Sequence, residues 1–327
     1  ANTDQGSAYI FVRIGTTWTQ QAKLIAANGA AGDNFGFSVA LSGDTAIVGS
    51  WRDDVGASAD QGSAYVFVRS GTTWAQQAQI TATGGASGDF FGGSVALSGN
   101  TAIVGALFDD IAANEDQGSA SVFTRSGTTW TQQAQLTAPG GGAFENFGAA
   151  VALGAPGDTA IVGVPYGRVG ANGDQGSACV FVRAGASWSL QARLTASDGA
   201  ASDYFGSSVV ISGDTATIGS PYDDVGSNSN QGSAYFFVRS GSSWSQQAKL
   251  TAANGAAGDV FGTSVALSGD TALVGANSDD VGANANQGSA WFFDVPASDF
   301  SLARNEVTDI SYPTLAAALL PAQPGQQ

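Results

Sequence analysis

The feature that most constrains the fold of this chain is an internal repeat with a period of 56 residues. The tetrapeptide Gln-Gly-Ser-Ala recurs six times at this spacing, except for one interval of 58 residues, and starts at Gln5, Gln61, Gln117, Gln175, Gln231 and Gln287. Five tryptophans and five Phe-Gly pairs keep the same steps, at Trp18, Trp74, Trp130, Trp188 and Trp244 and at Phe35, Phe91, Phe147, Phe205 and Phe261. Because each repeated unit buries its apolar face against a neighbour, such a period predicts a solenoid, a propeller or an array.

Each unit contains four short runs that are typical of β-strands. In the unit that starts near residue 35 we expect strands at 38–41, 45–48, 64–68 and 74–80. Gly43-Asp44 separates the first two runs, and this pair suits a two-residue hairpin turn. The first three runs are apolar on both faces and the fourth is rich in Gln and Thr, which indicates an outer strand in contact with water. Four antiparallel strands repeated radially predict an all-β, five-bladed β-propeller with four strands per blade.

Composition narrows the choice of partners. The 27 acidic and 11 basic residues give a net charge of −16, which argues against nucleic acid and anionic membranes as partners. The sequence contains no apolar run long enough to span a membrane as a helix. It starts at Ala1 without Met, from which we expect a cleaved signal peptide and an extracellular location, secreted or at the cell surface. The single cysteine, Cys179, is expected to be a small core residue.

Short motifs in each unit resemble the FG-GAP repeat, which builds the propeller of integrin α-subunits and of many bacterial secreted and surface proteins. The matching segments are Phe35-Gly36, then Val48-Gly49-Ser50, and then Tyr65-Val66-Phe67. The variant with Gly-Asp-x-Phe-Gly and Asp-Asp-Val-Gly is the closer match, and the resemblance covers residues 5 to 294. It implies a propeller domain over residues 1–294, with units that start near 35, 91, 147, 205 and 261, followed by a non-repeat tail at 295–327.

The resemblance also raises the question of calcium. Integrin-like blades often carry an Asp-x-Asp-x-Asp-Gly loop between their first two strands. Here that connection is only Ser42-Gly43-Asp44, too short to supply the oxygen ligands that calcium needs. The sequence therefore departs from the calcium pattern of the family at this position.

Paired carboxylates occur in another loop, between the second and third strands of four units. These residues are Asp53, Asp54, Asp109, Asp110, Asp223, Asp224, Asp279 and Asp280. A second set precedes each Phe-Gly pair, at Asp33, Asp89, Asp203 and Asp259, with Glu145 in the third unit. Strand alternation predicts that both loop sets share one face of the disc. One hypothesis is a ring of Ca²⁺ sites made of these carboxylates, and the alternative is that the same residues cap turns.

The opposite face is expected to carry five recurring arginines, Arg13, Arg69, Arg125, Arg183 and Arg239. Each arginine either pairs with a turn residue such as Asp44 or helps discs to stack head to tail into a filament. The third unit breaks the pattern, with Glu145, Gly167-Arg168 and a longer loop at 153–158. Such a break in a pseudo-symmetric ring is what a single ligand site requires, and sequence drift explains it equally well.

The ends of the chain determine how the ring closes. Counting strand candidates gives five blades of four strands and one further third strand. We expect N-terminal strands within residues 5–25 to complete the last blade, which leaves one strand with an unpaired edge. That strand is either covered or used for assembly. Candidate assembly residues are Ala290, Trp291, Phe292, Phe293, Leu315, Leu319 and Leu320.

Catalysis has little support in the sequence. The chain contains no histidine, and Cys179 has no partner that would activate it as a nucleophile. The sequence therefore favours a non-catalytic extracellular binding or adhesion module, acting through its acidic loop face with or without calcium. Its partner would be a protein or glycan on a cell surface or matrix. The alternative is a structural subunit that binds copies of itself, in a surface filament or sheath.

Overall fold

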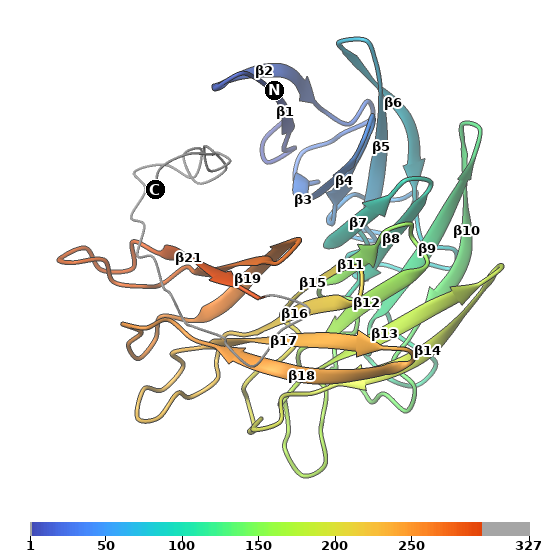
Figure 1. Cartoon of the computed structure of the whole chain (residues 1–327). Helices are drawn as coiled ribbons and strands as arrows, with labels where there is room; N and C mark the ends of the chain where they lie inside the picture. Colours follow the sequence, from blue (N-terminus) through green and yellow to red (C-terminus); the bar gives the residue numbers. More distant parts are fainter. Residues whose placement is uncertain (1, 296–327) are drawn as a thin grey trace.

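The computed structural model describes residues 2–295 and contains only β-strands in that range. Its strands follow one another as antiparallel sheets around a common centre (Figure 1). This arrangement confirms the all-β, five-bladed propeller, built on a plan of four antiparallel strands per blade.

Four blades contain all four strands in sequence order. The first consists of β3 (Phe35–Ser42), β4 (Thr45–Ser50), β5 (Ser63–Ser70) and β6 (Thr73–Ile80). The second consists of β7 (Ser94–Ser98), β8 (Thr101–Ala106), β9 (Ser119–Ser126) and β10 (Thr129–Leu136). The third consists of β11 (Val151–Gly154), β12 (Thr159–Val164), β13 (Ser177–Ala184) and β14 (Ser187–Leu194). The fourth consists of β15 (Ser208–Ser212), β16 (Thr215–Ser220), β17 (Ser233–Ser240) and β18 (Ser243–Leu250).

The two ends of the described chain differ from this plan. The fifth blade has β19 (Phe261–Ser268), β20 (Thr271–Ala276) and β21 (Ser289–Asp294), and the N-terminus forms a separate hairpin of β1 (Ala8–Ile14) and β2 (Thr17–Leu24). We expected strands within residues 5–25 to complete the last blade, but in the structure β2 pairs with β1. The reason is that β1 and β21 are copies of the same third strand, and the fourth strand β2 pairs with β1, to which a tight turn joins it, and not with β21.

Local sequence explains the strands. Gly43-Asp44 forms the two-residue turn between β3 and β4, with Gly43 at a φ of 57° that favours glycine. All six residues of β4 are buried, whereas β6 alternates between exposed and half-buried positions along most of its length. The expected contrast between apolar inner strands and a polar outer strand is therefore confirmed.

The recurring glycines allow adjacent blades to approach backbone to backbone. A Cβ atom on Gly49 of β4 would lie 2.0 Å from the carbonyl oxygen of Gly92, in the Phe-Gly motif of the next blade. The hydroxyl of Ser38 also donates to that oxygen, at 2.7 Å. The same approach recurs from Gly105 to Gly148. The glycine in the second strand of one blade thus contacts the glycine of the Phe-Gly motif in the next blade.

Apolar clusters fill the space between neighbouring blades. Between the first and second blades, Ile47 and Val66 pack with Phe91, Val104 and their neighbours. Cys179 lies in the next cluster, is 1% exposed, and has a thiol whose pKa burial raises to about 11. This confirms the expectation that Cys179 is a core residue.

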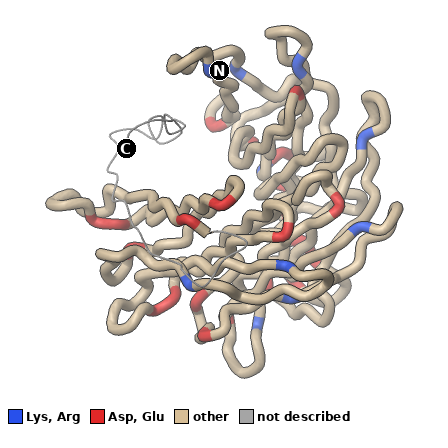
Figure 2. The backbone as a smooth tube through the Cα atoms, in the orientation of Figure 1, with Lys and Arg blue, Asp and Glu red and all other residues tan. Residues whose placement is uncertain are grey.

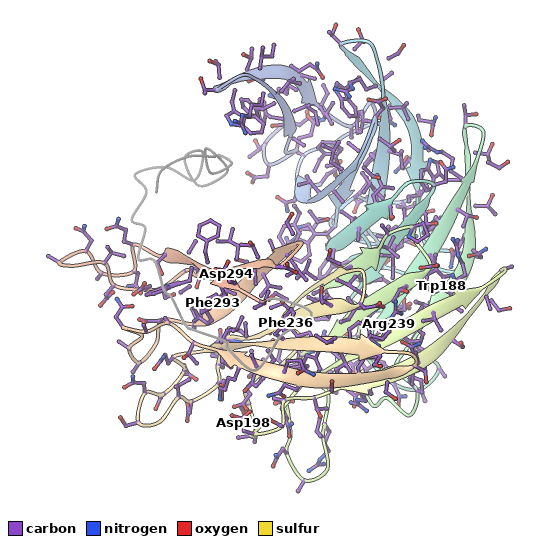
Figure 3. The ribbon with its side chains drawn as sticks, viewed as in Figure 1. Trp188, Asp198, Phe236, Arg239, Phe293 and Asp294 are labelled. Atoms are coloured by element: carbon purple, nitrogen blue, oxygen red, sulfur yellow. The ribbon has the colours of Figure 1, made fainter. Side chains whose placement is uncertain are left out.

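The repeated tryptophans join the outer strands of adjacent blades. The indole N–H of Trp130 donates to the side chain of Gln77 in the preceding blade, at 3.1 Å. Gln77 faces no residue across the sheet, because the pairing of β5 with β6 passes from Gln76 to Ala78. Trp188, labelled in Figure 3, makes the equivalent bond to Gln133 at 3.0 Å. Each blade thus uses its bulged glutamine to hold the tryptophan of the next.

Candidate functional site

Two sets of loops leave the same end of the blades and form what we call the loop face. One set joins the second and third strands within a blade, and the other joins one blade to the next. The paired aspartates lie in the first set, and the carboxylates that precede the Phe-Gly motifs lie in the second. The turns that join first to second and third to fourth strands lie at the other end, which we call the turn face.

The first aspartate of a pair serves the scaffold. Asp53 is 4% exposed, and its Oδ2 accepts hydrogen bonds from the hydroxyl of Ser63, from Tyr65 Oη at 2.7 Å and from Gln79 Nε2 at 2.8 Å. These donors come from the third and fourth strands of the same blade. Asp53 therefore ties the loop to both strands, and its Oδ2 is fully used as an acceptor within the blade.

The fourth blade replaces the glutamine with a lysine at the same position. Lys249 Nζ lies 2.6 Å from Asp223 Oδ2 and 2.7 Å from Asp198 Oδ2. Burial alone would lower the pKa of Lys249, but the hydrogen bonds and charges of the two carboxylates outweigh it and raise this pKa. Asp223 is thus held by a cation that the chain itself supplies.

The second aspartate of each pair caps its own loop. Its Oδ1 accepts the backbone N–H six residues further along, at 2.7–2.9 Å. The four pairs are Asp54 with Asp60, Asp110 with Asp116, Asp224 with Asn230, and Asp280 with Asn286. This is the turn-capping role that short acidic side chains commonly play.

The four aspartates before the Phe-Gly motifs are also turn caps, whereas the Oε2 atom of Glu145, their counterpart in the third unit, is buried without a hydrogen-bond partner. The Oδ2 atom of Asp89 accepts the backbone N–H of Ala86 at 2.6 Å, and Asp33, Asp203 and Asp259 repeat this bond. Burial, assisted by the charges of Asp109 and Asp110, raises the pKa of Asp89 to about 6, against the effect of the Ala86 N–H. Neighbouring carboxylates therefore make the loop face electronegative.

These carboxylates do not fit a calcium site. Within residues 2–295 no group of three or more His, Cys, Asp or Glu side chains converges in a way that could hold a metal ion. The aspartates instead bind donors of their own blade, as Asp53 and Asp54 show. Calcium needs six to eight oxygen ligands, so carboxylates that already bind donors of their own blades are a poor donor set.

The arginines of the turn face are engaged as well. Arg69 pairs with Asp44 and Arg239 with Asp214, at 2.5 and 2.6 Å. Each of these two guanidinium groups also lies over the ring of a tryptophan in its own blade, within 5.7 Å of the centroid. Figure 3 labels Arg239 near the end of β17, away from Asp198 in the loop before β15. Figure 2 shows the basic residues as separate positions rather than one patch.

The candidate assembly residues fall into two groups. On β21, Trp291 and Phe293 are buried against the fourth blade, whereas Ala290 is exposed and Phe292 is half-buried. Leu315, Leu319 and Leu320 lie outside the described residues. The structure therefore places one face of β21 in the core, and within residues 2–295 no blade packs on its other face.

The loop face also carries a set of aromatic residues that was not predicted from the sequence. They form two clusters, one of Phe37, Trp51, Phe90 and Phe108 and one of Tyr166, Tyr204 and Tyr222. Most occupy positions inside the repeated motifs where the residue type changes between units: the residue before Phe-Gly and the loop after the second strand. Variation at a fixed motif position was the signal that could have found them.

Comparison with known families agrees with this architecture. The family model described as FG-GAP repeat matches residues 18–67, 74–123, 130–181, 188–237 and 244–293. Each match runs from the fourth strand of one sheet through the third strand of the next. A search of the curated proteins found no match. No helix in the described part of the chain is long and apolar enough to cross a membrane. Five successive matches cover most of the sequence, and the chain belongs to the FG-GAP repeat family.

Proposed function

We propose that this chain is a non-catalytic, extracellular binding or adhesion module that contacts its partner through the loop face. The observation that carries the proposal is the difference between the two ends of the blades. Arginines of the turn face recur in successive units and are bonded to their own or to the preceding blade. The loop face carries exposed aromatic side chains that differ between units, such as Tyr166 and Tyr222. Exposed tyrosine and tryptophan are enriched at protein interfaces.

The chemistry of the chain supports binding over catalysis. Histidine, the commonest general base, is absent from the sequence. Burial raises the pKa of the Cys179 thiol to about 11, which keeps it protonated and unreactive near neutral pH. The loop carboxylates are bonded within their blades in recurring sets. We therefore expect a protein or glycan of a cell surface or matrix as the partner, bound without chemical change.

A matched pair of blocking variants tests which face binds. Ser227→Cys lies in a loop of the loop face and Ser242→Cys in a turn of the turn face, both exposed and both in the fourth blade. Because Cys179 is buried, a polyethylene glycol maleimide should react only with the new thiol. We expect the Ser227 conjugate to lose binding to extracellular matrix or intact cells and the Ser242 conjugate to keep it. Equal binding by both conjugates would contradict the proposal.

A comparison of the protein with calcium and with a chelator provides a control for this experiment. Because the loop carboxylates already bind donors of their own blades, we expect the melting temperature and the binding to be the same with calcium and with a chelator. A ligand that binds only the folded state raises the melting temperature. A clear rise with calcium would restore the hypothesis of a calcium-assisted module.

The alternative function is a structural subunit of a surface filament or sheath. One observation favours it: among the described residues β21 is the last hydrogen-bonded strand of its sheet, and Ala290 and Phe292 lie on the face opposite the buried Trp291 and Phe293. An unpaired strand edge is a template for pairing with another chain. Light scattering and electron microscopy distinguish the two functions, since a concentration-independent monomer is expected for the binding module and long polymers for the filament.

A further inference from the structure

Three aromatic residues of the loop face occupy one repeated position in three successive blades. The residue three after the glycine of the second strand is Phe108 in the second blade, Tyr166 in the third and Tyr222 in the fourth. Tyr166 and Tyr222 are 41% and 42% exposed, and Phe108 is half-buried. The second, third and fourth blades pack on one another in this order (Figure 1). We call these three residues the aromatic arc.

Further rings widen the arc. Tyr204 lies between Tyr166 and Tyr222, with its ring centroid 4.9 Å from each of theirs. Phe90 contacts Phe108, with the two ring centroids 5.4 Å apart. Aromatic surface is therefore available to a ligand along three blades and not at a single point.

A charged side chain follows each ring of the arc two residues later. These side chains are Asp110, Arg168 and Asp224, and all three are exposed. In the third and fourth blades the intervening residue, Gly167 or Asp223, is buried, so the ring and the charged group on either side of it both face solvent. Each of the three blades thus presents an aromatic ring next to a hydrogen-bonding group.

The charged groups beside the arc retain capacity for further hydrogen bonds. Asp110 and Asp224 cap their loops through Oδ1, and a carboxylate accepts through two oxygens. Arg168 donates to the carbonyl of Ala171 through Nη2, and a guanidinium has five N–H donors. Within residues 2–295 none of the three takes part in a salt bridge.

The signs of these groups indicate the chemistry of the ligand. Two are carboxylates, which only accept hydrogen bonds, and one is a guanidinium, which only donates them. A ligand of one charge sign would be repelled at one or two of the three positions, whereas a hydroxyl group both donates and accepts and suits all three. The net charge of −16 also disfavours a polyanion. A neutral ligand rich in hydroxyl groups therefore fits the arc.

We propose that the aromatic arc, together with the charged group beside each ring, binds a linear neutral polysaccharide across three blades. The C–H groups on the face of a sugar are apolar and pack on an aromatic ring, and the hydroxyl groups at its edge form hydrogen bonds. Chains of β-linked glucose suit this arrangement, because their equatorial hydroxyl groups leave both ring faces apolar. A binding unit repeated on three blades matches a ligand that is itself a repeat. The proposal rests on the proposed use of the loop face and adds the class of ligand.

Affinity electrophoresis tests the ligand class. The probe is hydroxyethyl cellulose, a soluble neutral chain of β-linked glucose, dissolved in a native gel. The control is polygalacturonate, which carries a carboxylate on each sugar. We expect the protein to migrate more slowly with hydroxyethyl cellulose than without polysaccharide, and at an unchanged rate with polygalacturonate. No retardation by hydroxyethyl cellulose, or equal retardation by both polysaccharides, would overturn the proposal.

A salt series separates these contacts from attraction between charges. Stacking and hydrogen bonds to a neutral chain involve no ion pairs, so the affinity should change less than about twofold between about 0.05 and about 0.5 M NaCl, where exposed charges become screened. A loss of affinity of about tenfold over this range would contradict a neutral ligand.

Variants locate the site. Tyr222→Ala should weaken the binding of hydroxyethyl cellulose about three- to tenfold, and Tyr222→Phe should keep it, since the ring face is retained. Phe144→Ala is the control, because it removes a ring that is 54% exposed on the loop face outside the arc, and it should change nothing. Unchanged binding by Tyr222→Ala, or an equal loss in Phe144→Ala, would overturn the proposal. Circular dichroism checks that each variant is folded.

The length of the ligand tests whether the arc acts as one extended site. In isothermal titration calorimetry we expect cellohexaose to bind at least about tenfold more tightly than cellobiose, because a longer chain engages more than one blade. Equal affinities would contradict an extended site. The arc and the loop face can fail separately: if the Ser227 conjugate loses matrix binding while Tyr222→Ala keeps it, the loop face stands as the binding face and the arc fails.

Discussion

The inner strands of the first two blades have nearly the same sequence and very different surroundings. On β3, Val39 and Leu41 are 62% and 60% exposed, whereas on β7 the equivalent Val95 is 9% exposed and Leu97 is half-buried. The second blade packs on the first, but among the described residues only the β1–β2 hairpin packs on the corresponding side of the first blade, and it leaves Val39 and Leu41 exposed. Burial in this fold is therefore supplied by the neighbouring blade.

The last blade shows the same effect on its opposite side. Leu273 of β20 is half-buried, whereas the equivalent Ile47 and Ile103 are fully buried between blades. Interior and terminal positions of one repeat thus provide matched pairs, in which the side chain is nearly constant and only the neighbour differs. The following predictions use these pairs, from the largest expected effect to the smallest.

The largest effect is expected where two backbones touch. Gly105→Ala would place a Cβ atom 2.0 Å from the carbonyl oxygen of Gly148, which is backbone and cannot move alone. We expect a loss of about 3 kcal/mol in the free energy of unfolding, typical of an overpacked interior.

The matched control is Gly275→Ala in the fifth blade, where the nearest atom is the hydroxyl oxygen of Ser264. A serine hydroxyl can rotate away, and alanine suits a strand better than glycine, so we expect a change within about 1 kcal/mol of zero. Urea unfolding followed by circular dichroism measures both variants. Equal losses would show that contact between blades does not explain the recurrence of this glycine.

A smaller effect is expected from the tryptophan bridge between blades. Trp130→Phe removes the hydrogen bond to Gln77 and weakens the contact with Arg125, whose guanidinium carbon lies 5.2 Å from the indole centroid. Together these contacts should be worth about 1–2 kcal/mol. Trp18→Phe in the hairpin is the control: Trp18 is 42% exposed, and we expect a change below about 0.5 kcal/mol. If both variants lost the same amount of stability, the tryptophan would act through contacts within its own blade and not through the contact between blades.

The smallest effect is expected in the pH dependence of stability. The pKa of Asp89 is raised to about 6 in the folded state, mainly by burial, above its unfolded value of about 3.9. The folded state therefore binds this proton more tightly, so its contribution to stability falls as pH rises from about 4 to 6.

Asp89→Asn keeps an oxygen that can accept the Ala86 N–H and removes the ionisation. Relative to wild type, the variant should become progressively more stable as the pH rises from about 4 to 7. Melting temperatures across this range measure the gain. A constant difference between the two proteins would show that Asp89 is not the titrating group.

Much of the fold could be predicted from the sequence because the same pattern of strand and turn residues recurs in every unit. The turn at Gly43-Asp44, the apolar inner strands and the core position of Cys179 all follow from local pattern and appear as expected. The partners of the first aspartates could not be read in the same way. Asp53 meets Tyr65 and Gln79 only because the loop after β4 folds back onto β5 and β6, and no spacing along the chain distinguishes such a bonded carboxylate from a metal ligand.

The sequence by itself determined the repeat, the four-strand unit and the family. The pattern of apolar residues and the turn residues are local features, and they recur in all five repeats. Tertiary structure alone decided how the ends are used and which loop residues gather. β1 and β21 carry equivalent sequences, and only the pairing in space assigns β21 to the fifth sheet. Tyr166 and Tyr204 come from different blades, and their contact depends on how one blade packs against the next, a relation that no single unit encodes.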